Sequence, residues 1–189
     1  LDATRCNSEF TTATIEDLRW LGLSWAEGPD GEGDHGPYFQ SQRSDFYLQA
    51  WQRLAQQKNI YPSPHSRRDL ETAAFAPHVS DEGESVFPKN YRPNEWVVPE
   101  HPGRVPWRFR VPDGKTIQFV DKNFGLVQRV AGTDFGDFVV WRRDNLAAYE
   151  LAVVVDDYHM EIGEVVRGKD LLTSTARQLL LYEALGWKS

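Results

Sequence analysis

The sequence predicts an α/β protein that is interrupted by an inserted region of short elements. The last third alternates β-branched runs with a helical pattern, in the order strand, turn, helix that is typical of α/β folds. All but two of the 11 prolines, Pro29 and Pro37, fall within residues 61–113, where they break every long pattern and indicate short elements. With 189 residues, 40% of them hydrophobic, the chain can bury one core.

Two helices are predicted before the insertion. Thr12 or Thr14 can cap the first, over residues 15–25, because its apolar residues recur near helical spacing. Residues 28–36, rich in glycine and acids, then predict a loop. Ser44 is the expected N-cap of the second helix, over residues 44–60, whose apolar residues fall mostly on one face.

Alternating and β-branched segments predict the strands. They are "WRFRV" (107–111), "TIQFV" (116–120) and "DFVVWRR" (137–143). The run "LAAYELAVVV" (146–155) stays open, because its three valines favour a strand while residues 146–152 favour a helix. A further strand is predicted at "IGEVV" (162–166), followed by a helix that Asp170 can cap and Gly186 ends. Arg167 would then lie at the carboxyl end of a strand, where α/β proteins bind ligands.

A basic stretch interleaved with aromatic residues lies within residues 89–115. The arginines that could contact a nucleic-acid backbone there are Arg92, Arg104, Arg108 and Arg110. A solvated basic face explains the same pattern equally well. The net charge of the whole chain, −7, disfavours generic coating of nucleic acid.

Composition also bears on the compartment. No stretch approaches the run of roughly 18 apolar residues that a membrane helix needs, so we expect a soluble protein with no membrane partner. A lone cysteine, Cys6, cannot form an internal disulfide, which fits a reducing, cytoplasmic compartment. The chain starts at Leu1 without the pattern of a signal peptide, and we expect it to be a fragment.

Four segments, in order along nearly the whole chain, resemble the glutamyl-tRNA synthetase family of class I synthetases. They are "GPYFQSQR" (36–43), "IYPSPHSRRDL" (60–70), "AYELAVVVDD" (148–157) and "VVRGKDLLTSTARQLLLYEALGW" (165–187). Within the family, the chain is most similar to the glutamyl-Q-tRNA(Asp) synthetases, short paralogues without an anticodon-binding domain. The resemblance implies a partial Rossmann-type α/β catalytic core with an inserted acceptor-binding region.

The activity that this resemblance implies has two steps. L-glutamate and ATP, with Mg²⁺, give glutamyl-adenylate, and the glutamyl group then passes to a hydroxyl of a tRNA. In the short paralogues that hydroxyl belongs to the queuosine base of tRNA(Asp). The alternatives are an ordinary glutamyl-tRNA synthetase and, in another class, a non-catalytic paralogue that binds RNA or a partner. We expect a monomer.

The family's glutamate-binding residues in this half fall on Tyr149 and Arg167. A free amino acid presents a carboxylate and an ammonium, so a planar cationic fork and an oriented aromatic hydroxyl suit it. Without the resemblance, a core tyrosine and a surface ion pair of Arg167 with Asp156 or Asp157 would explain the same residues.

Asp156 and Asp157 end one apolar run and Arg167 ends another. Two solvated element ends would explain this pattern. The resemblance instead indicates the mouth of an active site, where the acids could complement an ammonium or a metal ion. Asp170 could face the same site or act only as a helix cap.

The family's signature motifs are outside the chain, so no catalytic residue is assigned. Its HIGH-type motif would lie before Leu1 and its KMSKS-type loop after Ser189, and the segment alone should be nearly inert because adenylyl transfer depends on positioning and charge stabilisation. We expect residues 1–60 to belong to the first half of the core, 61–135 to the insertion and 136–189 to the second half.

Many glutamyl-Q-tRNA(Asp) synthetases bind zinc in the insertion, through a Cys-x-Cys pair and a Tyr-x-x-x-Cys. Here the four positions hold Ser63, His65, Phe87 and Tyr91, of which only His65 is a good zinc ligand. We therefore expect no zinc, with Tyr61, Phe87 and Tyr91 packed in its place.

Overall fold

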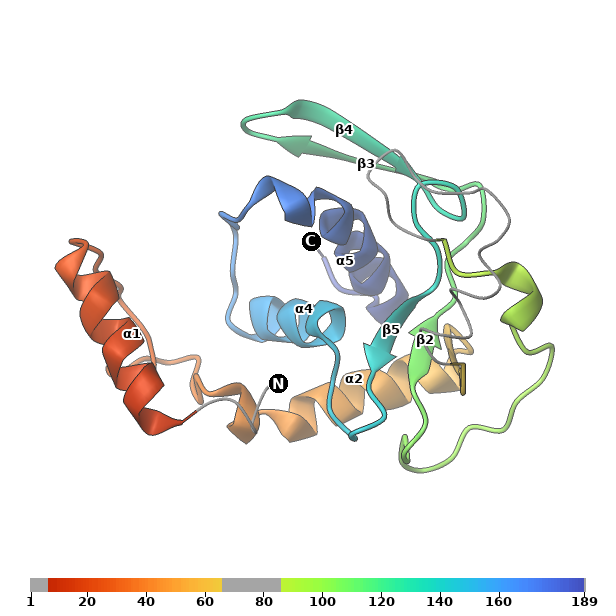
Figure 1. Cartoon of the computed structure of the whole chain (residues 1–189), viewed down its shortest axis with the longest axis horizontal. Helices are drawn as coiled ribbons and strands as arrows, with labels where there is room; N and C mark the ends of the chain where they lie inside the picture. Colours follow the sequence, from red (N-terminus) through yellow and green to blue (C-terminus); the bar gives the residue numbers. More distant parts are fainter. Residues whose placement is uncertain (1–6, 66–85, 189) are drawn as a thin grey trace.

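Three helices form the centre of the molecule. The computed structural model describes residues 7–65 and 86–188. Helices α2 (Ser44–Gln56), α4 (Tyr149–His159) and α5 (Leu172–Leu185) pack against one another, as Figure 1 shows. Their facing side chains, among them Trp51, Leu54, Leu151, Val155 and Leu181, are fully buried and form the core.

A small antiparallel sheet covers these helices in the order β1-β2-β5. Its strands are β1 (Ile60–Pro62), β2 (Trp107–Phe109) and β5 (Phe138–Trp141). The predicted alternation at residues 107–111 is confirmed, since Trp107, Phe109 and Val111 are all buried. Trp107 packs edge-on against Trp51 of α2, with ring centroids 4.9 Å apart. Sheet and helices therefore share one core.

A separate hairpin, β3 (Thr116–Asp121) and β4 (Gly125–Val130), runs beside α5 (Figure 1). The predicted strand at 116–120 is confirmed, and its partner β4 was not predicted. Ile117 and Val127 of this hairpin are buried, whereas the cross-strand pair Val120 and Leu126 is exposed. One face of the hairpin thus covers the helices.

Helix α1 (Ser8–Trp20) stands apart in Figure 1, and none of its residues is buried. The predicted caps are wrong: Asn7 caps the helix by accepting a hydrogen bond from the Phe10 amide at 2.9 Å. The hydroxyls of Thr12 and Thr14 instead donate to carbonyls one turn earlier, as helical threonines can.

Helix α2 is confirmed, with different ends. Ser44 is its first residue, and the N-cap is Arg43, whose side chain makes no capping bond. The helix ends at Gln56 instead of residue 60, because Lys58 takes a left-handed conformation (φ 60°) and Ile60 begins β1. A short 3₁₀ turn, η1 (Gln40–Gln42), precedes α2, and a second, η2 (Lys89–Tyr91), follows the undescribed residues 66–85.

The valine-rich run is a helix. In α4 the buried residues Leu151, Ala152, Val154 and Val155 recur at helical spacing and face α2, α5 and β5. Tertiary packing of this face outweighs the weak preference of valine for strands.

The predicted strand at residues 162–166 is wrong. These residues are irregular, and Val165 and Val166 are exposed. Within the described residues every pairing of named strands is antiparallel, so the expected strand–turn–helix unit is not formed there. Asp170 lies in η3 (Lys169–Leu171) and does not cap α5, which has Leu171 at its N-cap and makes no side-chain capping bond there. Gly186 ends α5 in a left-handed conformation, as predicted.

Candidate functional site

Arg167 lies in the irregular segment before η3, and its guanidinium is held by α5. Its Nη1 donates to Gln178 Oε1 at 2.8 Å, and its Nη2 donates to Thr175 Oγ1. Among the residues that the structure describes, neither partner is charged, and the alternative ion pair with Asp156 or Asp157 is not formed. The guanidinium is fixed in place without being neutralised by a direct contact.

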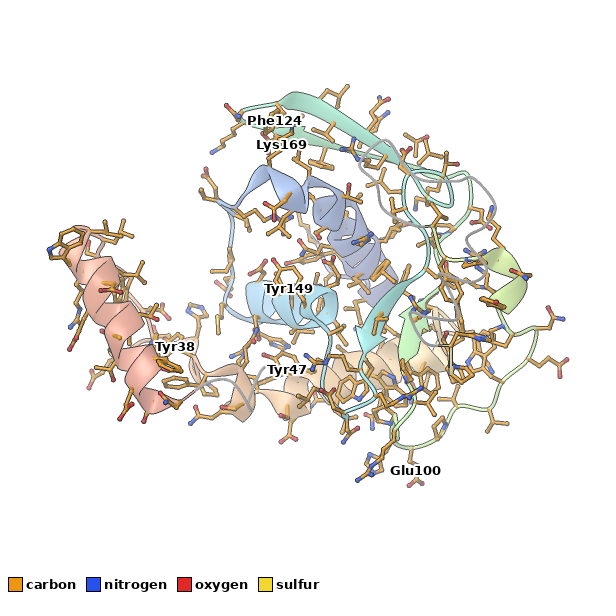
Figure 2. The ribbon with its side chains drawn as sticks, viewed as in Figure 1. Tyr38, Tyr47, Glu100, Phe124, Tyr149 and Lys169 are labelled. Atoms are coloured by element: carbon orange, nitrogen blue, oxygen red, sulfur yellow. The ribbon has the colours of Figure 1, made fainter. Side chains whose placement is uncertain are left out.

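Tyr149 begins α4 and is 42% exposed, so it is not a core tyrosine (Figure 2). The next residue, Glu150, is buried and accepts hydrogen bonds from Ser174 Oγ at 2.8 Å and Gln178 Nε2 at 3.0 Å. Burial raises the pKa of Glu150, although these bonds and Arg177 oppose the shift. Gln178 therefore connects Arg167 to the first turn of α4, which carries Tyr149.

Arg167 also lines a cavity of about 410 Å³ between the hairpin end and the segment before α5. Phe124 and Lys169 lie close together there, with the ammonium 5.5 Å from the ring centroid (Figure 2). Tyr149 is not among the lining residues, and it is connected to the Gln178–Glu150 hydrogen bond only through the backbone of α4, so the structure does not bring the two predicted glutamate ligands together in this cavity.

Asp156 has a structural role that the sequence did not reveal. Its carboxylate accepts from Arg43 Nε at 2.6 Å, from the Tyr47 hydroxyl at 2.9 Å and from Gln40 Nε2 at 3.1 Å. The side chain of Arg43 is only 1% exposed and also donates to the Pro37 carbonyl. Asp156 thus ties segment 36–43 and α2 to α4, and its place at the mouth of an active site stays a prediction.

Asp157 remains close to the Arg167 region. Burial and the neighbouring Asp156 raise its pKa, and the charge of Arg167 opposes that shift. Asp170 is exposed, and its carboxylate lies against Gly168. The two acids at the end of the apolar run therefore differ. Asp156 is held by hydrogen bonds to Arg43 and Tyr47, whereas Asp157 is partly buried and its charge interacts with that of Arg167.

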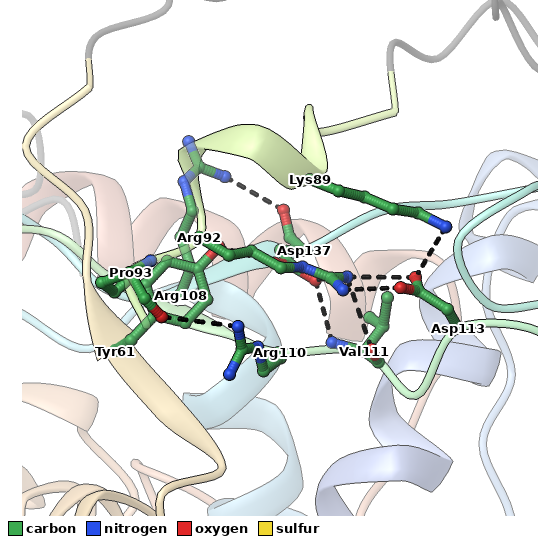
Figure 3. Close-up of polar contacts among 9 residues, drawn as sticks. All are labelled: Tyr61, Lys89, Arg92, Pro93, Arg108, Arg110, Val111, Asp113 and Asp137. Atoms are coloured by element: carbon green, nitrogen blue, oxygen red, sulfur yellow. Dashed lines mark hydrogen bonds and ion pairs between the residues drawn. The ribbon is translucent and has the colours of Figure 1, made fainter. Parts of the chain in front are cut away.

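Of the arginines considered for RNA, Arg92 is internal. Figure 3 shows its guanidinium between Asp137, at 2.7 Å from both Nε and Nη2, and Asp113, at 2.6 Å from Nη1. Asp137 also accepts from the Tyr61 hydroxyl and the Val111 amide. Because Arg92 is 10% exposed and its guanidinium contacts two carboxylates, little of it is accessible for the predicted RNA contact.

The other three arginines differ in accessibility. Arg108 is half-buried, donates to the Asp137 carbonyl at 3.1 Å and lies 4.3 Å from the Phe87 ring centroid. Arg110 packs near the rings of Tyr61 and Trp96. Arg104 is exposed and lines an open cavity of about 710 Å³ with Arg142, Arg143 and Asp144.

Three of the four positions that the resemblance aligns with zinc ligands, His65, Phe87 and Tyr91, lie together. His65 stacks on Tyr91 with centroids 4.2 Å apart, and Tyr91 contacts Phe87 edge-on at 6.1 Å. Phe87 also contacts Tyr61, so the expected packing of these three aromatic residues is confirmed. Ser63 is fully buried, and its hydroxyl has no partner among the described residues. This donor set does not fit a tetrahedral zinc ion, which prefers thiolates and imidazoles.

Two features are absent from the described residues. No group of three or more His, Cys, Asp or Glu side chains that could hold a metal ion occurs within residues 7–65 and 86–188. In the same part of the chain, no helix is long and apolar enough to cross a membrane.

Sequence reasoning missed four residues that organise the site: Arg43, Asp137, Glu150 and Gln178. Their partners lie up to 113 residues away, so no local pattern points to them. The one available signal was composition, since Asp137, Glu150 and Gln178 are polar residues inside or beside apolar segments, whereas Arg43 lies among polar residues and gives no such signal.

Comparison with known proteins gives consistent relatives. The chain is 46% identical over 191 residues to the glutamyl-Q tRNA(Asp) synthetase of Symbiobacterium thermophilum. This alignment covers 98% of the chain and 58% of that protein. It is 44% identical to the glutamyl-Q tRNA(Asp) synthetase of Nitratidesulfovibrio vulgaris, in an alignment that covers 98% of the chain and 58% of that protein. It is 38% identical to the glutamate–tRNA ligase of Lactobacillus johnsonii, in an alignment that covers 92% of the chain and 36% of that protein. The chain thus spans less than two thirds of the curated relatives it matches.

Solved structures agree on the fold. The chain matches a glutamate tRNA ligase from Elizabethkingia meningosepticum with a TM-score of 0.77 at 24% identity, over 100% of this chain and 39% of that one. The model of the family described as "tRNA synthetases class I (E and Q), catalytic domain" matches residues 1–189. The chain belongs to this family, the catalytic domain of the class I tRNA synthetases of the E and Q type.

Proposed function

We propose that this chain is part of an enzyme that activates L-glutamate and transfers the glutamyl group to tRNA. In the first step the α-carboxylate attacks the α-phosphorus of ATP, glutamyl-adenylate forms and pyrophosphate leaves. Mg²⁺ enters with ATP as part of the substrate and offsets phosphate charge. In the second step an RNA hydroxyl attacks the activated carbonyl and AMP leaves.

The observation that carries this proposal is Arg167, held by two neutral groups. Because the α-carboxylate has to react, the side-chain carboxylate of glutamate is the group available for a lasting ion pair. A fixed guanidinium with donors to spare suits that carboxylate and disfavours a neutral amide. Tyr149, exposed at the start of α4, supplies a hydroxyl and a ring face to the same substrate. We assign the substrate ammonium to Asp157, whose charge interacts with that of Arg167.

We further propose queuosine in tRNA(Asp) as the acceptor. Support comes from the two relatives named as glutamyl-Q tRNA(Asp) synthetases, at 46% and 44% identity, against 38% for the glutamate–tRNA ligase of Lactobacillus johnsonii. The second candidate is an ordinary glutamate–tRNA ligase, which that relative favours. A non-catalytic paralogue that binds RNA or a partner is the candidate of another class.

One experiment separates these candidates, and it uses the protein at the full length of its relatives. Glutamate-dependent exchange of labelled pyrophosphate into ATP tests activation, with glutamine and aspartate as controls. Labelled glutamate is then offered to tRNA(Asp) with queuosine, tRNA(Asp) without it and tRNA(Glu). Labelling of the first tRNA alone is expected. Labelling of tRNA(Glu) alone would favour the ordinary ligase, and absence of both exchange and transfer would favour the non-catalytic paralogue.

For the RNA contact we propose the exposed cluster around Arg104, with Arg142 and Arg143, in place of the internal Arg92. The proposal keeps the other earlier expectations: a monomer in the cytoplasm, an insertion at residues 61–135 that binds the acceptor, core parts at 1–60 and 136–189, and little activity of the segment alone.

We also propose that the protein binds no structural zinc. Protein purified without an affinity tag should contain far less than one zinc per chain by elemental analysis, because His65 is the one good ligand among the four family positions. Stoichiometric zinc that is lost in a His65→Ala variant would contradict this.

A further inference from the structure

We propose that Gln178 is a positioning residue that orients Arg167 for a substrate carboxylate and keeps its charge available. The inference rests on the function proposed above, in which Arg167 binds the side-chain carboxylate of glutamate. Gln178 belongs to α5, is 7% exposed and contacts no proposed substrate group itself.

The hydrogen bonds allow only one orientation of the Gln178 amide. Its oxygen accepts from Arg167 Nη1 at 2.8 Å, and its nitrogen donates to Glu150 Oε2 at 3.0 Å. A guanidinium has no acceptor, so the amide nitrogen cannot face Arg167. Ser174 donates to the other Glu150 oxygen and fixes that carboxylate in turn. Each end of the amide is therefore determined by its neighbour.

This arrangement leaves the guanidinium with capacity for a ligand. It has five N–H donors, of which Gln178 and Thr175 take one each. Three remain, and a carboxylate that binds through both oxygens needs two. Thr175 also lines the cavity that Arg167 borders, so this second partner is close to open space.

Gln178 also separates two opposite charges. Glu150 lies on one side of the amide and Arg167 on the other, each within hydrogen-bond distance of it. A carboxylate in place of the amide would pair with Arg167 directly and compete with the substrate. The neutral amide orients the Arg167 guanidinium through a hydrogen bond but does not neutralise its charge, which therefore remains available to a substrate carboxylate.

The test replaces the amide by a carboxylate of the same shape. In Gln178→Glu, the KM for glutamate in pyrophosphate exchange should rise by about 10-fold or more, with the KM for ATP within about twofold of the parent value, since the lost interaction concerns glutamate alone. Gln49→Glu adds the same charge on an exposed position of α2 and should change neither constant. In an Arg167→Ala background, Gln178→Glu should add no further effect on the glutamate KM, because the two residues act together.

Thr175→Val provides a second, nearly isosteric test that does not depend on whether Gln178→Glu folds. It removes the other partner of Arg167 and should also raise the glutamate KM selectively. If Arg167→Ala raises this KM while Gln178→Glu and Thr175→Val leave it unchanged, the positioning role is wrong and the proposed function stands. If Arg167→Ala has no effect, or if exchange does not depend on glutamate, the proposed function fails and this inference with it.

Discussion

Two partly or largely buried arginines, Arg92 and Arg167, are held in opposite ways. Arg92 lies between the carboxylates of Asp113 and Asp137, so its charge is matched inside the chain. Arg167 is held by an amide oxygen and a hydroxyl, so its charge is not matched by a direct contact among the described residues. An arginine paired with buried carboxylates joins elements together, whereas one held only by neutral groups remains able to bind an anion.

The elements that each network joins support this difference. Asp137 precedes β5 and connects Tyr61 of β1, Arg92 after η2 and Val111 after β2 (Figure 3). It therefore holds together parts of the chain that flank the undescribed residues 66–85. The Arg167 network joins α5 and the start of α4 on one side and borders a cavity on the other. We call the Arg92 network closed, because its charges are matched within the chain, and the Arg167 network open, because it borders a cavity.

The largest effect is expected from breaking the closed network. Asp137→Asn replaces a carboxylate that accepts from Arg92, Tyr61 and the Val111 amide with an amide whose nitrogen cannot accept, and it should lower the free energy of unfolding by about 3–5 kcal/mol, the usual cost of removing one partner of a buried ion pair. Urea unfolding followed by tryptophan fluorescence measures this. The control is Asp144→Asn, which breaks the exposed pair with Arg142 and should cost no more than about 1 kcal/mol. Equal losses in the two variants would remove the distinction between a closed network and a surface pair.

A smaller effect is expected at the RNA surface. Arg104→Ala should weaken tRNA binding and reduce the slope of log affinity against log salt by about 0.7–0.9, because one phosphate contact is lost. Filter binding at several salt concentrations gives the slope. Glutamate activation in the absence of tRNA should be unaffected. An unchanged slope would mean that Arg104 belongs to a solvated basic face.

The sequence predicted those parts of the fold that depend on local pattern. The alternation of residues 107–111 and 116–120 gave the correct strands, and the one-faced apolar pattern gave α2. Residues 162–166 have the composition of a strand, but within the described part of the chain they pair with no strand. The valine run at 153–155 could not be assigned until α2, α5 and β5 were seen to pack on its helical face.

For the site, sequence motifs pointed to Tyr149 and Arg167, whose roles stay predictions. They could not separate Asp156 from Asp157, because the difference arises from Arg43 and Tyr47, more than 100 residues earlier in the chain. In the same way, Arg92 and Arg104 look alike in a basic stretch, and only the position of Asp137 makes one internal. Burial and charge pairing are properties of tertiary contacts and leave no reliable local pattern.

The central claim is that Arg167 retains its charge for the substrate, and the glutamate dependence of pyrophosphate exchange in Arg167→Ala tests it most directly. The measurement uses protein at the full length of its relatives, with parallel titrations of glutamate, glutamine and ATP. Loss of a charge-assisted bond should cost about 1.5–3 kcal/mol of transition-state stabilisation, which lowers kcat/KM for glutamate roughly 10- to 150-fold. The preference of the enzyme for glutamate over glutamine should become smaller. The KM for ATP and the unfolding midpoint should stay close to the parent values. An unchanged glutamate dependence, or a loss of stability as large as that of Asp137→Asn, would contradict the account.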